Sequence, residues 1–143
     1  ATTKILSLFA GKDDDGNGSI YAGDAAKLYK FKSSDSSLED KSKAGGYSTA
    51  ANNYWDFVQF GETLLASNFN DPIQTATVSG AAVFADLTGS PPRAKFIEVV
   101  RDQVFCGYTN DSADGTKPYR LRWSGINDAT SWTLAQISAI FRT

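Results

Sequence analysis

The sequence has no histidine, no methionine and only one cysteine, Cys106. Histidine is the commonest general base and the commonest metal ligand, so its absence excludes a conventional serine triad. A single cysteine forms neither an internal disulfide nor a zinc cluster, and its apolar neighbours predict a buried, inert thiol. The acids outside one aspartate-rich loop include Glu39, Asp40, Glu62, Asp86, Glu98 and Asp102. Nothing marks two of them as flanking a cleft, as glycoside hydrolysis requires, and we predict that the protein is not an enzyme.

The charge balance and the short apolar runs exclude further classes. Fourteen basic residues oppose sixteen acidic ones, and the net charge of −2 argues against a protein that wraps duplex DNA. A local basic strip that contacts DNA is still compatible with this balance. No apolar run approaches the ~20 residues that span a bilayer, and no signal-peptide pattern opens the chain, so we expect no membrane partner. A chain that begins with Ala1 and lacks methionine is predicted to be processed or part of a longer protein.

Glycine, proline, asparagine and aspartate divide the sequence into short runs rich in aromatic and β-branched residues, which is typical of β-strands. Residues 57–60 and 63–67 read as two strands around a glycine-containing turn. Residues 96–100 and 103–107 have the same form, and Leu64 and Val104 occupy equivalent places in the two hairpins. The sequence therefore predicts an all-β protein of 143 residues in one domain.

The strands recur with a period of about 45 residues. Predicted strands at 28–31, 73–76 and 119–123 each follow a loop and each precede an apolar residue about ten positions on: Leu38, Phe84 and Trp132. A hairpin, a third strand and a short fourth strand form a β-propeller blade. We predict a propeller-like array of four-stranded antiparallel blades with repeat units 1–50, 51–95 and 96–143; a four-stranded sandwich is the alternative. Propellers usually have at least four blades, so three units predict an incomplete propeller, or a fragment of one, that needs partners.

Three segments resemble virion proteins of tailed bacteriophages: YRLRWSGINDATSWT at 119–133, YWDFVQFGE at 54–62 and AGDAAKLYKF at 22–31. The resemblance implies a structural component of the tail or of the head-to-tail region, with propeller-like β architecture. It also implies that the protein is localised in the virion and contacts other virion proteins or copies of itself.

The C-terminal motif supports two interpretations. Arg120 and Arg122 alternate with Leu121, so both arginines lie on one face of the strand. Trp132 is expected to fold back onto Trp123. Either this is a tryptophan pair in the core with solvated arginines, or the arginine face meets a neighbouring subunit or nucleic acid. The residues expected to form the architecture or an interface are these two arginines and seven aromatic residues: Trp55, Phe57, Phe60, Phe84, Phe96, Trp123 and Trp132.

Residues 13–24 fit the spacing of a twelve-residue calcium loop, as in EF-hands and dockerins. Asp13, Asp15, Asn17 and Asp24 would supply the ligand oxygens. The flanking segments 5–10 and 19–22 look like strands rather than helices, so a solvated hairpin turn is the alternative. Apart from calcium, no cofactor is expected.

Two further expectations concern loops and function. The polar segment 33–43 is predicted to be a mobile surface loop. As an alternative to a virion protein, the chain is a small carbohydrate-binding β module that uses exposed tryptophan or tyrosine, with or without calcium.

Overall fold

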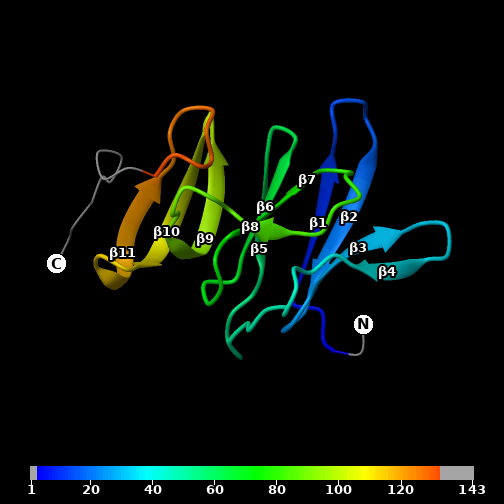
Figure 1. Cartoon of the computed structure of the whole chain (residues 1–143), viewed down its shortest axis with the longest axis horizontal. Helices are drawn as coiled ribbons and strands as arrows, with labels where there is room; N and C mark the ends of the chain where they lie inside the picture. The colour runs from blue at the N-terminus through cyan, green and yellow to red at the C-terminus, as the bar shows by residue number, and fades with distance from the viewer. Residues whose placement is uncertain (1–2, 133–143) are drawn as a thin grey trace.

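The computed structural model describes residues 3–132, which form eleven β-strands and no helix (Figure 1). The predicted all-β class is confirmed. Since the described part of the chain has no helix, it has none that is long and apolar enough to cross a membrane.

The strands form three separate antiparallel sheets, and each sheet is a meander of strands that are consecutive in the sequence. The first sheet contains β1 (Ser7–Lys12), β2 (Gly18–Gly23), β3 (Leu28–Lys32) and β4 (Ser37–Asp40). The second contains β5 (Asp56–Phe60), β6 (Thr63–Ser67), β7 (Gln74–Thr77) and β8 (Ala85–Asp86). The third contains β9 (Arg93–Val100), β10 (Gln103–Asp111) and β11 (Gly115–Trp123).

Both predicted hairpins are confirmed. Strands β5 and β6 join through a turn at 61–62, and β9 and β10 join through a turn at 101–102. Gly61 has a φ of 60°, a left-handed conformation that glycine adopts without a Cβ clash. Leu64 and Val104 are each the second residue of their strand, and both are fully buried.

The predicted mobile loop at 33–43 was wrong, because this segment contains β4. Residues 37–40 pair in register with β3, with Leu38 opposite Phe31. The Lys41 side chain is buried where it donates to Glu39 Oε1 at 3.0 Å and to the Ala81 carbonyl at 2.7 Å. Backbone pairing with β3 and the buried Lys41 ammonium group therefore order this segment, although its polar composition is typical of a loop.

The second sheet is buried on both faces, and this arrangement produces two cores. Phe57 and Leu64 contribute to the core shared with the first sheet, whereas Val58 and Leu65 contribute to the core shared with the third. The members of the core between the first and second sheets are Tyr21, Leu28, Tyr47, Trp55, Phe57, Leu64, Ala66, Val78 and Phe84. A strand covered on both sides needs a continuous apolar run rather than an alternating one.

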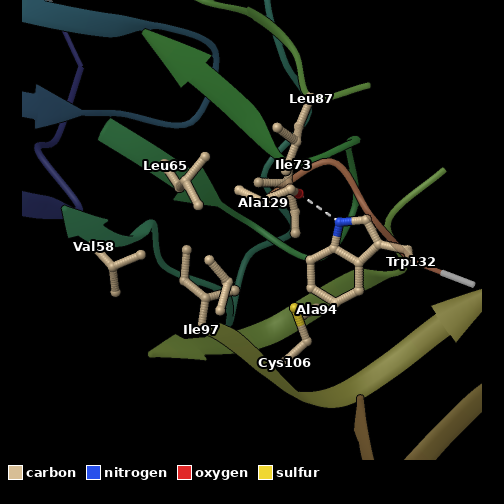
Figure 2. Packing of buried hydrophobic residues seen from close by; sticks show 10 residues of the cluster. Val58, Leu65, Ile73, Leu87, Ala94, Ile97, Cys106, Ala129 and Trp132 are labelled. Atoms are coloured by element: carbon tan, nitrogen blue, oxygen red, sulfur yellow. Dashed lines mark hydrogen bonds between the residues drawn. The ribbon is translucent and has the colours of Figure 1, made fainter. Parts of the chain in front are cut away.

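The core between the second and third sheets is closed by the segment that follows β11. Figure 2 shows the Trp132 ring beside Ala94 and Cys106, with its Nε1 donating to the Ala129 carbonyl at 2.6 Å. The other members of this core are Val58, Leu65, Ile73, Leu87, Ile97 and Val104. Gly89 lies against the Thr130 carbonyl, where a Cβ would come within 1.6 Å of the oxygen. Only glycine allows this close approach.

The three sheets lie side by side with their first strands adjacent: β5 contacts β1 on one side and β9 on the other. The side chain of Gln59 in β5 accepts a hydrogen bond from the Lys12 N–H at Oε1 (3.1 Å) and donates one from Nε2 to the Lys12 carbonyl (2.6 Å). On the other side, Asp56 Oδ2 accepts the Ile97 N–H at 2.8 Å. Each neighbouring pair of sheets is therefore linked by hydrogen bonds as well as by an apolar core.

Asp56 gives a testable pH dependence. Burial raises its pKa above the usual value of 3.8, even though the Ile97 N–H acts in the opposite direction. The folded protein therefore binds a proton more tightly than the unfolded chain, and this contribution to stability is lost as the pH rises from 3.8 through the folded pKa. We expect Asp56→Asn, which keeps an acceptor for Ile97, to remove this loss and to be at least as stable as the wild type at pH 7. Urea unfolding of both proteins from pH 3.5 to 7 measures this; a variant less stable at pH 7 would contradict it.

Candidate protein contact faces

Both ends of the three-sheet stack present an apolar surface. On the first sheet the outward face, called face 1, consists of Leu8, Ala10, Ile20, Phe31 and Leu38. Register places them together, since Ala10 pairs with Ile20 and Phe31 pairs with Leu38. Leu8 is 70% exposed and Ile20 is 47% exposed. Their neighbours Phe9 and Tyr21 point the other way, into the core against the second sheet.

The outward face of the third sheet, called face 3, consists of Phe96, Val100, Phe105, Leu121 and Trp123. Phe96 and Leu121 flank Gly107 in one row across the sheet, and Phe105 pairs with Trp123 in the next row. The Phe105 and Trp123 rings stack with centroids 5.4 Å apart. Phe96 is 57% exposed and Val100 and Leu121 are also exposed. Apolar side chains on adjacent strands and rows at both ends are typical of an interaction surface.

Phe96 is one of the residues predicted to form the architecture or an interface, and its exposed side chain lies on face 3 rather than in a core. The reason is the register: Ile97, not Phe96, faces the second sheet. The other predicted aromatic residues divide by depth. Trp55, Phe57, Phe84 and Trp132 are buried, Phe60 packs against the core while partly buried, and Trp123 is half-buried. The predicted pairing of Trp132 with Trp123 was wrong, since Trp123 stacks on Phe105 on the opposite side of the sheet from the core that holds Trp132.

The prediction of solvated arginines was also wrong. Arg120 is 2% exposed and Arg122 is 6% exposed, and both lie on the inner side of β11. Asp111 Oδ2 accepts Arg120 Nη2 at 2.5 Å and Arg122 Nη1 at 3.0 Å. Arg120 Nη1 also donates to Asp114 at 2.7 Å. Burial is tolerated because these carboxylates, nine and six positions before Arg120 in the β10–β11 hairpin, supply the opposite charge.

The electrostatics of this cluster hold Asp111 ionised. Burial alone would raise its pKa, but the Asp114 N–H and the positive charges of Arg120 and Arg122 outweigh burial and lower the pKa below 3.8. Arg122 Nη2 donates to the Trp132 carbonyl at 3.1 Å, which ties the cluster to the segment that closes the core. The two arginines therefore serve the architecture, and neither presents a surface to nucleic acid.

The four predicted calcium ligands do not come together. Asp13 and Asn17 lie in the β1–β2 turn, where Asp13 Oδ1 accepts the Asn17 N–H at 2.7 Å, and Asp15 lies exposed between them. Asp24 lies at the far end of β2. The segment is thus a hairpin turn followed by a strand, as the alternative expected, and not a twelve-residue loop. Among residues 3–132 no group of three or more acidic or cysteine side chains is placed to hold a metal ion.

Asp24 has a structural role instead. Its side chain is 2% exposed; Oδ1 accepts the N–H groups of Ala26 and Lys27 at 2.8 and 2.7 Å, and Oδ2 accepts the Tyr29 hydroxyl at 2.9 Å. Thr3 also donates to Oδ2. Burial alone would raise the pKa of Asp24, but these hydrogen bonds lower it. Asp24 therefore closes the loop between β2 and β3.

The remaining candidates for chemistry are accounted for by the fold. Cys106 is fully buried, and burial raises the pKa of its thiol to about 12, which keeps it a protonated thiol at neutral pH. Ser124 is fully buried, with its Oγ accepting the Val104 N–H at 2.9 Å. Glu62 and Asp102 lie in the β5–β6 and β9–β10 hairpin turns.

Sequence reasoning missed faces 1 and 3. A signal was present: consecutive apolar residues in strands at both ends of the stack, such as 8–10 in β1 and 96–97 with 99–100 in β9. Such runs place apolar side chains on both faces of a strand, and a strand at the end of a stack has only one face to bury.

No protein-family model matches this sequence, and neither does any curated protein.

Proposed function

We propose that this chain is a non-enzymatic structural protein that acts through protein–protein contacts in the tail or head-to-tail region of a tailed bacteriophage. Its three sheets are proposed to be consecutive blades of a propeller-like array that other chains complete. The observation that carries the proposal is the pair of apolar end faces: the sheets bury each other's faces inside the stack, whereas faces 1 and 3 have no sheet against them within residues 3–132.

The absence of an assembled site among the described residues agrees with this function. Acidic side chains such as Asp40, Asp86 and Asp111 are in ion pairs, and the side chains of Ser124 and Cys106 are fully buried. The phage assignment itself depends on the resemblance of the segments at 22–31, 54–62 and 119–133. The segment at 22–31 contains most of β3, the segment at 54–62 contains β5 and the segment at 119–133 contains the end of β11, so the resemblance covers part of each sheet.

The carbohydrate-binding alternative has less support. A binding platform of that kind needs an exposed aromatic ring, and Trp55 and Trp132 are buried while Trp123 stacks on Phe105. Tyr54, which precedes β5, and Tyr119 of β11 are the exposed tyrosines on which this alternative would depend. A glycan array tests this alternative directly: binding that Trp123→Ala abolishes would favour it over the virion protein.

The proposed function is tested in phage particles. Lysates of an infected or induced host culture are separated on a density gradient, and peptides of this chain are quantified by mass spectrometry in every fraction. We expect the chain to follow the particles at a constant ratio to the major capsid protein across the peak. Recovery of the chain only in the soluble fractions at the top of the gradient would contradict the proposal.

A further inference from the structure

The stacking of the sheets has a direction. Leu64 in β6 and Val104 in β10 are equivalent residues, and each points to the preceding sheet. The pairing is equivalent too: Leu64 pairs with Gln59, the penultimate residue of β5, and Val104 pairs with Val99, the penultimate residue of β9. The second and third sheets are therefore turned the same way, and each presents the same face to the sheet before it.

In the second sheet the next residue along the second strand, Leu65, points to the following sheet and is buried in the core with the third sheet. In the first sheet, whose hairpin turn is longer, the residue of β2 buried in the core with the second sheet is Tyr21, the fourth residue of the strand. The residue of β10 equivalent to Leu65 is Phe105, which lies on face 3. Face 3 is thus the face that a following sheet would cover. Ile20 precedes Tyr21 in β2 and points away from the core with the second sheet, so it belongs to the face that a preceding sheet would cover.

We infer that face 3 of one copy of this chain binds face 1 of a second copy, head to tail. This inference rests on the proposed function, because it names the partner of the same contact faces. The contact would repeat the relation between the first and second sheets and between the second and third. The union is heterologous, since one copy contributes face 3 and the other face 1, and repetition of it gives a ring if the rotation closes.

Composition and charge favour this pairing over two like faces. Face 3 supplies three aromatic rings, Phe96 and the stacked Phe105 and Trp123, whereas face 1 supplies one, Phe31, among smaller aliphatic side chains. Lys12 follows Ala10 on the outward side of β1, and Glu98 lies beside Phe105 on face 3. A face 1 to face 3 contact brings opposite charges to the interface, whereas two copies of either face bring like charges together.

The experiment uses two double variants of the full chain, each with one face blocked by charge. Leu8→Glu/Ile20→Glu blocks face 1, and Phe96→Glu/Leu121→Glu blocks face 3; all four side chains are exposed, so the fold should be retained. Val83→Glu, an equally drastic change at an exposed residue outside both faces, is the matched control. Circular dichroism and thermal unfolding establish that each variant is folded, and analytical ultracentrifugation measures its mass.

We expect the wild type and Val83→Glu to sediment above the 15.4 kDa monomer and each double variant alone to sediment as a monomer. An equimolar mixture of the two double variants is expected to form a complex of twice the monomer mass and no larger, because one intact face 1 and one intact face 3 meet once. If a double variant fails to fold, the two single variants Leu8→Ser and Phe96→Ser replace the double variants. Self-association is expected to be at least tenfold weaker in each single variant and to be restored in their mixture.

Three results would overturn the inference. A wild type that is monomeric at all concentrations excludes a second copy as the partner. A face 1 variant that still dimerises by itself shows that two copies of face 3 pair with each other. If the two double variants are monomeric and form no complex in the mixture, the head-to-tail contact is excluded. In each case the particle fractionation tests the proposed function separately. If the chain is a monomer in solution but is recovered in particles, the proposed function is retained and another virion protein is the partner.

Discussion

Replacement of Asp111 by Ala is expected to destabilise the protein by about 3–5 kcal/mol, the cost of removing one partner of a buried ion pair. Asp111 holds two buried guanidinium groups, those of Arg120 and Arg122, through contacts of 2.5 and 3.0 Å. Without it, Arg122 loses its only carboxylate partner among the described residues, and Arg120 keeps Asp114 and the Thr109 hydroxyl. Urea unfolding at pH 7, followed by tryptophan fluorescence, measures the change in the free energy of unfolding.

Asp114→Ala is the matched control for this prediction. Its side chain is half exposed to solvent and contacts Arg120 alone at 2.7 Å, so we expect a loss below about 1 kcal/mol, as for ion pairs in contact with water. Equal losses for the two variants would contradict the assignment of Asp111 as the centre of the cluster.

The lowered pKa of Asp111 adds a pH dependence to the same prediction. Because its folded pKa lies below 3.8, its contribution to stability is present above 3.8 and is lost as the pH falls through the folded pKa. The difference between the wild type and Asp111→Ala should therefore be full at pH 7 and should shrink only below pH 3.8. A difference that shrank at pH 6 would identify another group.

Replacement of Trp55 by Ala is expected to cost about 3–5 kcal/mol, the usual loss for a large aromatic side chain removed from a core. The ring lies between the first and second sheets, in edge contact with Tyr47 at a centroid distance of 4.9 Å. Its Nε1 donates to the Asp24 carbonyl at 2.8 Å, which links the core to the β2–β3 loop. Thermal and urea unfolding measure the loss.

Gly23 provides an independent check on the position of Trp55. A Cβ at residue 23 would lie 2.3 Å from the Trp55 ring, so Gly23→Ala forces the ring to move and should also destabilise the protein. In the Trp55→Ala background that clash is absent, and the Gly23→Ala change should then have little further effect. Additive losses would show that the ring does not pack on Gly23.

The strands of this protein were readable from the sequence because short-range rules produce them. Turn residues such as Gly61 separate runs of β-formers, and the hairpins around 61–62 and 101–102 follow from local pattern alone. The repeated equivalence of Leu64 and Val104 was readable for the same reason. The propeller-like arrangement stays a prediction, since the described residues form three separate sheets and no closed ring.

The errors concern which side of a strand is covered, which depends on contacts between strands rather than on the pattern within one strand. Arg120 looked solvated because its partner Asp111 lies on another strand. Trp132 was expected to pack on Trp123, but the two rings lie on opposite sides of the third sheet. The calcium spacing of Asp13 and Asp24 came from counting positions along the chain. Strand β2 extends between them and keeps them apart.

The sequential order of strands within every sheet has a consequence for synthesis of the chain. All backbone pairing joins neighbouring strands, so each sheet closes only short loops, which favours rapid hairpin formation. The first sheet is complete at Asp40, yet its inner side is covered only when Phe57 and Leu64 have been made. A nascent chain therefore carries an uncovered apolar sheet for the time needed to translate a further hairpin, and during that interval it is the form most prone to aggregation.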